Sequence, residues 1–440
     1  MVSVNISDFS CIKDANLQLA PVNIIIGPQG SGKSVTTKVL YFCNDIIVNS
    51  IQSAEKGESI EDFKKSLAKQ FSLWFPPSAW GQERFTINYA AGDFTARILR
   101  RRSKGRVSDE ISITFSEWFA DFYSSALTLF EKSRTNSDDE IKSSAQATRF
   151  LDQFWRIRDI VSRRLLTELK NDYFAQQTFI PAGRAFFTSI GRLVAGFEQA
   201  GNLDPVTIKF ARLFATIRDR NSRRYVSRLH RLGPDFLEKR RVFMENFFGG
   251  ELNFKDDLEF VETQDGRKIP FSSLSSGQQE LLPMWSLIDY FNEMDSYRQE
   301  AGVKVPRGPR ELIYIEEPEA HLFPSAQSLL MEFLIGSVTP DKSKRCLIIT
   351  THSPYIMGKL NVFLKAGQLA RRKKKNQEIN DVVPRECWLN DKQLSAFAIE
   401  DGKLRSLLDE DSLIDGRYLD QISEDISRDF SKLLRIEAEI

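Results

Sequence analysis

The segment that most restricts the fold of this chain is a glycine-rich octapeptide near its amino terminus. The apolar run Val22–Ile26 leads directly into it, and its sequence matches GxxxxGK[ST]. A buried strand, a glycine-rich turn and a following helix together form a cradle in which backbone N–H groups surround phosphates. The sequence therefore predicts a P-loop nucleotide-binding fold. The residues predicted to form the cradle are Gly27, Pro28, Gln29, Gly30, Ser31, Gly32, Lys33 and Ser34.

Two positions of this loop have distinct predicted roles, and a second segment supplies their partners. Lys33 is expected to reach the β and γ phosphates of ATP, and Ser34 to bind Mg²⁺. The apolar stretch Glu311-Leu-Ile-Tyr-Ile-Glu-Glu317 reads as a buried strand with acids at its carboxyl end. Glu316 is predicted to hold Mg²⁺, because this cation takes oxygen ligands, and Glu317 to activate the attacking water. The simpler reading is a buried strand followed by a solvated acidic turn, and the P-loop upstream favours the catalytic one.

Two weaker motifs acquire meaning from their positions. Leu274-Ser-Ser-Gly-Gln-Gln279, just before a helix expected at Leu281–Met294, resembles the LSGGQ signature of ABC ATPases, although alone it would read as an ordinary loop. The resemblance implies that Ser275, Gly277 and Gln278 contact the γ-phosphate of ATP held by a second subunit. Because one chain cannot place its own signature on its own P-loop, the motif implies a head-to-tail homodimer around two ATP molecules.

A histidine follows another predicted apolar strand. His352 lies in Thr350-Thr-His-Ser-Pro354, about 35 residues after the acidic strand, and fits the switch histidine that contacts the γ-phosphate and the attacking water. A purely structural histidine is the alternative. The chain has three histidines in all, which argues against a metal or HNH nuclease site that needs several of them.

Taken together, these motifs resemble ABC-type ATPases related to the ATPase half of OLD-family nucleases, a group called AAA15-like. Phe179-Ile-Pro-Ala-Gly-Arg184 also resembles a recurring segment of that family, near where ABC proteins have their Q-loop. The chain departs from the family at Phe323, where a second histidine is common. The other residues that carry the resemblance are Gly27–Ser34, Ser275–Gln279, Ile315–Leu322 and Thr350–Pro354.

The resemblance also suggests a biological setting. OLD nucleases carry a Toprim domain with a strand-end Glu and a DxD pair, whereas Asp409-Glu-Asp411 here has no apolar strand before it and reads as a solvated turn. The chain is therefore expected to act like the ATPase subunits of Septu-type, PARIS-type and retron antiphage systems, with a separately encoded HNH or Toprim effector nuclease. A DNA-repair or chromosome-maintenance ATPase similar to RecF or SMC heads is the main alternative, and an ATP-gated scaffold with little turnover is a third.

Bulk composition adds few constraints. The 61 Lys and Arg nearly balance the 60 Asp and Glu, so only local basic clusters could bind nucleic acid. Three such clusters are Arg100–Arg106, Arg218–Arg231 and the best candidate, which consists of Arg371, Arg372, Lys373, Lys374 and Lys375. The alternatives are arginines paired with nearby acids or, for the third cluster, a disordered loop. Scattered cysteines, with no long apolar run and no signal peptide, favour a cytoplasmic protein with buried thiols and no membrane partner.

The expected architecture is an α/β P-loop NTPase of the ABC-head type, with a mixed sheet, an antiparallel β subdomain and a large helical insertion. We expect the head at 1–115 and 249–360, the insertion at 116–248, and a basic loop, short strands and a helix at 361–440. The expected strands are Val2–Ile6, Leu17–Leu19, Val22–Ile26, Phe85–Ala90, Thr95–Leu99, Ile111–Phe115, Leu252–Val261, Lys268–Pro270, Glu311–Ile315, Cys346–Thr350, Glu386–Leu389 and Phe397–Ile399.

Overall fold

The chain is described here from a computed structural model. The described residues are 1–103, 105–138, 144–190, 203–229, 233–255, 258–300, 310–338, 345–372, 376–416 and 427–434. The strands are β1 Ser3–Phe9, β2 Ile12–Gln18, β3 Val22–Ile26, β4 Thr86–Ala91, β5 Phe94–Ser103, β6 Arg106–Phe115, β7 Phe174–Ile180, β8 Gly250–Lys255, β9 Leu258–Thr263, β10 Lys268–Pro270, β11 Arg310–Glu316, β12 Arg345–Thr351, β13 Leu394–Glu400 and β14 Lys403–Ser406.

Helices cover the strands and connect them. The α-helices are α1 Lys33–Lys56, α2 Ile60–Trp74, α3 Glu117–Asp138, α4 Ser144–Leu169, α5 Ala185–Ile190, α7 Pro205–Leu229, α8 Pro234–Phe248, α9 Ser276–Glu300, α10 Pro324–Val338, α11 Pro354–Arg371 and α12 Asn376–Val382. Short 3₁₀ turns lie at Pro77–Ala79, Lys170–Asp172, Phe271–Ser273 and Arg385–Cys387. Residues 427–434 are also helical.

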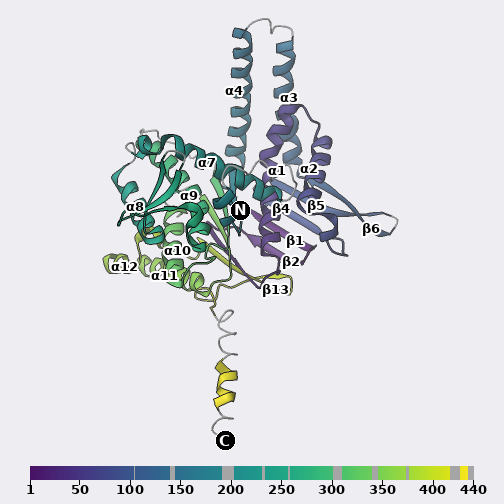
Figure 1. Cartoon of the computed structure of the whole chain (residues 1–440). Coiled ribbons are helices and arrows are strands. Elements are labelled where there is room, and N and C mark those ends of the chain that lie inside the picture. The colour runs from purple at the N-terminus through teal and green to yellow at the C-terminus, as the bar shows by residue number, and fades with distance from the viewer. Residues whose placement is uncertain are drawn as a thin grey trace.

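One large mixed sheet organises the molecule. Its eleven strands run in the order β6-β5-β4-β1-β2-β14-β13-β3-β12-β11-β7. Strands β13, β3, β12, β11 and β7 are parallel neighbours, whereas β6, β5, β4, β1 and β2 pair antiparallel. This arrangement confirms the predicted P-loop α/β fold with a mixed sheet and an antiparallel β portion (Figure 1). Strand β3 consists of four apolar residues and one asparagine, all buried. This composition suits a strand that lies inside the parallel half of the sheet and is covered on both faces.

Both faces of the parallel half are covered by helices. Side chains alternate along β3, so Ile25 joins the core that contains α1, and Ile24 joins the core on the other face. The second core contains Leu281 of α9, Leu330 of α10 and Leu360 of α11. The sheet is therefore the middle layer of three, and its strand ends are fixed from both sides.

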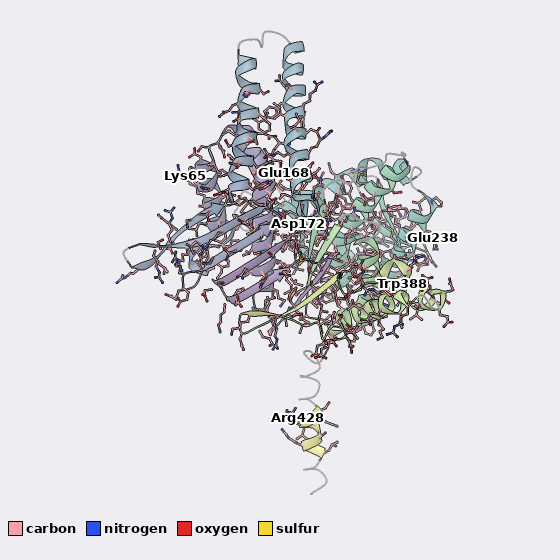
Figure 2. The ribbon with its side chains drawn as sticks, turned by 180° about the vertical axis from the view of Figure 1, so that it is seen from behind. Lys65, Glu168, Asp172, Glu238, Trp388 and Arg428 are labelled. Carbon is pink, nitrogen blue, oxygen red and sulfur yellow. The ribbon has the colours of Figure 1, made fainter. Side chains whose placement is uncertain are left out.

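Helices α3 and α4 form an arm that extends away from the sheet (Figure 1). Glu168 lies at its base (Figure 2), where Oε2 accepts a hydrogen bond from Trp118 Nε1 at 2.7 Å and Oε1 accepts one from Arg164 Nε at 2.7 Å. The Trp118 contact ties the last turn of α4 to the first turn of α3, and the Arg164 contact, within α4, fixes the Glu168 side chain. The predicted insertion 116–248 also contains β7, which is an edge strand of the large sheet.

Several sequence-based expectations about strands are wrong. The stretch Glu386–Leu389 is not a strand: Arg385–Cys387 forms a 3₁₀ turn after Pro384. Its alternating burial arises because Cys387 and Leu389 contact the core while Trp388 is half-buried and donates its Nε1–H to Val383 O. The stretch Leu252–Val261 is divided between β8 and β9, which pair antiparallel with each other, and β9 also pairs antiparallel with β10 in this second sheet.

The basic segment Arg100–Arg106 lies between the expected strands Thr95–Leu99 and Ile111–Phe115, yet β5 continues to Ser103 and β6 begins at Arg106. Arg100 is only 5% exposed, lies over the Trp80 ring at 5.5 Å and donates to the Gly81 and Ser108 carbonyl oxygens. An arginine committed to these partners stabilises the strand instead of forming a charged loop.

Replacing Trp80 by alanine should lower the free energy of unfolding by about 3–5 kcal/mol, the usual cost of truncating a buried aromatic residue. Trp80 is 0% exposed, and its Nε1 donates to Phe75 O at 2.7 Å. Chemical denaturation measures the change. Trp155, which is 61% exposed on α4, provides the matched control, and Trp155→Ala should change stability by less than about 0.5 kcal/mol. Equal losses in the two variants would contradict this account of the core.

Candidate functional site

The P-loop, Glu316, Glu317 and His352 meet at one edge of the sheet. Because β3, β12, β11 and β7 are parallel neighbours, their carboxyl ends lie side by side at this edge. The P-loop follows β3, Glu317 follows β11, His352 follows β12, and the segment Pro181–Arg184 follows β7. Residues separated by more than 300 positions in the chain are thereby brought together.

The P-loop requires its glycines. A Cβ atom on Gly27 would lie 2.8 Å from the Ile399 backbone oxygen, and one on Gly32 would lie 2.3 Å from Ile12 Cδ1. Gly32 also has a φ of 107°, a conformation that residues with side chains rarely adopt. Any side chain at these positions would therefore push the loop away from the strand ends and alter the phosphate cradle.

Lys33 opens α1 with its ammonium group folded onto the loop. Its Nζ donates to the carbonyl oxygens of Gly27 at 2.8 Å and Pro28 at 2.9 Å. Burial lowers the pKa of Lys33, and the negative charges of Glu317 and Glu316 oppose this effect. A desolvated cation beside the P-loop, facing acids across the site, is placed to meet an anionic ligand.

The residues present fit a bound Mg²⁺ ion. Glu316 is 7% exposed; its Oε2 accepts a 3.4 Å hydrogen bond from the Ala182 N–H, and its Oε1 is buried with no hydrogen-bond partner among the described residues. A buried carboxylate oxygen without a partner is costly, and a divalent cation would satisfy it. Ser34 is exposed on the first turn of α1, and the buried Ser31 hydroxyl likewise lacks a partner within the described part of the chain.

Glu317 and His352 form the closest predicted pair. His352 Nε2 lies 3.3 Å from Glu317 Oε1, with both side chains about one-third exposed. Glu317 has a φ of 43°, and its N–H donates to Thr350 O at 2.9 Å, which fixes this left-handed conformation to the end of β12. A non-glycine residue held in such a conformation is strained, and strain of this kind is concentrated at functional sites.

Glu319 is a site residue that sequence reasoning missed. Its Oε1 accepts from the His352 N–H at 2.8 Å and from the Thr351 hydroxyl at 2.5 Å, so it fixes the loop that carries His352. Its Oε2 is buried with no hydrogen-bond partner in the described ranges. The sequence feature that could have indicated Glu319 is its position two residues after Glu317, in Glu317-Pro-Glu319.

The signature motif lies at the start of α9. This helix begins at Ser276, five residues before the predicted Leu281, so most of the motif is its first turn. Ser275 is exposed, and its hydroxyl donates to Gln278 Oε1 at 3.1 Å. The side-chain nitrogen of Gln278 donates to Phe247 O. A Cβ atom on Gly277 would lie 2.6 Å from His321 O, so glycine allows the motif to pack on the loop after β11. Ser275 is therefore presented outward, away from this subunit's interior.

Arginines of the second and third basic clusters pair with acids, and for the second cluster this is the alternative given above. Arg218 forms an ion pair with Glu259, and Arg220 with Glu293 at 3.4 Å. Arg371 of the third cluster pairs with Asp391 across 20 residues of sequence. Lys373, Lys374 and Lys375 lie outside the described residues, as does most of the helix expected near the carboxyl terminus.

Three smaller expectations can be compared with the structure. Asp409–Asp411 forms an exposed turn, as predicted. Cys11 is exposed, unlike Cys43, Cys346 and Cys387, so the expectation of buried thiols is wrong for one of the four. No helix in the described part of the chain combines the length and apolar content needed to cross a membrane.

Comparison with known proteins identifies one family model, described as "AAA domain, putative AbiEii toxin, Type IV TA system", which matches residues 22–358. An OLD nuclease from Thermus scotoductus is 23% identical over 389 residues. The alignment covers 87% of this chain and 64% of the nuclease, so the chain spans less than two thirds of that relative's length.

Among solved structures, the SMC head domain from Thermotoga maritima is similar with a TM-score of 0.35 and 13% identity, covering 92% of this chain and 97% of that one. A structure of the recombination mediator protein RecF is similar with a TM-score of 0.28 and 12% identity, covering 92% of this chain and 97% of that one.

Proposed function

The chain belongs to this family of AAA domains, and from that premise we propose that it is an ABC-type ATPase that dimerises around two Mg-ATP and controls a separately encoded effector nuclease in antiphage defence. The observation that carries the ATPase part is the strained Glu317 beside His352, at the strand edge that also bears the P-loop. A buried lysine, a buried carboxylate oxygen lacking a partner among the described residues and an acid–histidine pair at one edge are what phosphoryl transfer to water requires.

Each residue has one task in the proposed reaction. The P-loop N–H groups and Lys33 bind the phosphates, while Ser34 and Glu316 hold Mg²⁺, which neutralises charge on the phosphate oxygens when bound. Glu317 accepts the proton of the attacking water, and His352 orients that water and the terminal phosphate. In the left-handed conformation of Glu317, its carbonyl oxygen accepts from Arg184 Nη2 at 3.2 Å, which leaves its side chain beside His352.

Dimerisation is proposed because the signature motif is presented outward. The exposed Ser275 hydroxyl and the first-turn N–H groups of α9 would bind the terminal phosphate of ATP held by a second copy. Two such contacts related by a two-fold axis close a head-to-tail dimer. Size-exclusion chromatography with light scattering tests this: Mg-ATP should convert Glu317→Gln from monomer to dimer, whereas Ser275→Arg in the same background should stay monomeric.

The defence role is supported by the relatives and is tested in cells. The matched family model names a toxin of a toxin–antitoxin system, and the aligned relative is a nuclease, which supports a chain that works with a second gene product on nucleic acid. A host carrying the chain and its neighbouring genes should resist phage, and Lys33→Ala should abolish the resistance. Resistance that survives Lys33→Ala would refute an ATP-dependent role, and failure of a nuclease to co-purify would refute the proposed effector.

A chromosome-maintenance or DNA-repair ATPase is the second candidate, and the exposed side chains of Arg371 and Arg372 at the end of α11 favour it. In that case DNA should raise the ATPase rate, and salt should suppress the increase, because phosphate contacts release counterions. The cluster Arg371–Lys375 is the proposed contact. Neutralising Arg372 together with the three lysines should weaken DNA binding, whereas an unchanged affinity would remove this cluster as a nucleic-acid site.

A further inference from the structure

Arg184 is a fully buried arginine with no direct role in the reaction proposed above, although it contacts the Glu317 carbonyl oxygen. It follows β7 at the end of Phe179–Arg184 and is 0% exposed. Burial lowers its pKa, the charge of Glu280 opposes this, and the guanidinium remains a cation with five donors in a fixed plane. Burying an arginine is costly unless its donors are satisfied, so its partners indicate what it does.

One set of partners lies at the amino-terminal end of the signature helix α9. Arg184 Nε donates to the Glu280 backbone oxygen at 2.8 Å, and the Arg184 N–H donates to Glu280 Oε2 at 3.2 Å. Four residues further on, the buried Thr188 hydroxyl donates to Gln279 O at 3.0 Å. Gln279 is the last residue of the signature motif, so this segment is fixed directly to the turn that carries Ser275 and Gly277.

The other set of partners is the end of β11. Arg184 Nη1 donates to Glu316 O at 2.8 Å, and Nη2 donates to Glu317 O at 3.2 Å. The neighbouring Ala182 N–H donates to Glu316 Oε2 at 3.4 Å. Arg184 therefore holds the two backbone units that place the metal-binding and catalytic acids.

We propose that Arg184 couples the two ATP sites of the dimer, by transmitting movement of the signature motif to the backbone of Glu316 and Glu317 in the same subunit. This proposal rests on the proposed function, because the signature of one subunit completes the site of the other. When the signature binds phosphate in the partner's site, α9 shifts, and the planar guanidinium carries the shift to the acids of its own site. Arg184 is thus a positioning residue that makes ATP engagement at one site favour the other.

The geometry of the guanidinium explains why arginine is used. Its three nitrogens point in fixed directions and reach Glu280, Glu316 and Glu317 at once. A lysine ammonium is a single point on a flexible stem and cannot bridge α9 and β11 in the same way. Arg184→Lys therefore keeps a buried positive charge while it removes the rigid link.

The test measures Mg-ATP binding by full-length protein in a Glu317→Gln background, where turnover is not needed. Binding should be cooperative, with a Hill coefficient above one, and adding Arg184→Lys should bring the coefficient to about one with half-saturation changed less than about threefold. Arg345→Lys is the matched control: Arg345 is also buried and paired, with Glu311 and Asp295, but at the opposite end of β12. The control should keep the cooperativity.

Two further measurements separate the possible outcomes. In protein that keeps Glu317, Arg184→Lys should lower the ATP hydrolysis rate at least tenfold. In the Glu317→Gln background, Glu280→Gln should cause part of the same loss of cooperativity while Arg184 is unchanged. Non-cooperative binding in the Glu317→Gln parent, or cooperativity that survives both substitutions in folded protein, would overturn the coupling role. Failure of the proposed function has a different signature, namely ATP binding that is absent or unaffected by Lys33→Ala.

Discussion

Replacing Glu317 by glutamine should lower the ATP hydrolysis rate by about 10²–10⁴-fold while leaving nucleotide binding nearly unchanged. Glutamine keeps the size of the side chain and the backbone contacts to Thr350 and Arg184, but it cannot accept the proton of the attacking water. With hydrolysis blocked, ATP should remain bound and the dimer should stay closed. Phosphate release measures the rate, and equilibrium binding of a fluorescent ATP analogue measures the affinity.

A matched variant separates chemistry from general damage to the site. Glu311 lies at the opposite end of β11, far from the strand edge that bears the P-loop. Its Oε2 forms an ion pair with Arg345 Nε at 2.9 Å. Glu311→Gln should retain at least about half of the wild-type rate, because it weakens a structural contact and leaves the catalytic groups in place. Normal hydrolysis by Glu317→Gln would show that another group activates the water.

Lys33→Ala should weaken ATP binding by roughly 10–100-fold, since each hydrogen bond to a charged group contributes about 1.5–3 kcal/mol. Hydrolysis should fall further than binding, because the lysine also opposes charge that develops on the transferred phosphoryl group. In the structure the ammonium is held by the Gly27 and Pro28 carbonyl oxygens, so truncation removes a group already positioned at the loop. Isothermal titration with Mg-ATP and a steady-state rate measure the two effects.

The control for this prediction lies on the same helix. Lys56 is exposed in the last turn of α1, and Lys56→Ala should leave both affinity and rate within about twofold of wild type, as expected for a surface substitution. An affinity for Mg-ATP that is the same in Lys33→Ala and Lys56→Ala would exclude the P-loop as the nucleotide site.

The sequence predicted best where one local pattern determines both structure and chemistry. The apolar β3 followed by a glycine-rich turn allows one interpretation, and Gly32 in a positive-φ conformation explains why the pattern is so specific. The acids after β11 and His352 after β12 could be placed because parallel strands end at a common edge. The strand at Glu386–Leu389 was predicted wrongly because a 3₁₀ turn that packs against the core can alternate buried and exposed side chains as a strand does.

Residues that act through long-range contacts could not be predicted in this way. Arg184 lies 96 positions from Glu280 and more than 130 from Glu316, and nothing in its local sequence indicates that all three meet. Glu319 has the same property, since its role depends on the loop that carries His352, 33 positions away. The pairing of Arg371 with Asp391 likewise depended on a fold that brings α11 beside the start of β13. Only the tertiary structure provides such contacts.

Mixing two inactive variants tests most directly whether each ATP site is shared between two subunits. Lys33→Ala destroys a P-loop, and Ser275→Arg blocks a signature motif. In a mixed head-to-tail dimer, the intact P-loop of the second variant faces the intact signature of the first, so one of two sites is restored. Equal mixing should recover between about one quarter and one half of wild-type ATPase activity, because each mixed dimer has one intact site of two and Ser275→Arg forms no dimer with itself. Activity no greater than the average of the two separate variants would contradict a shared site.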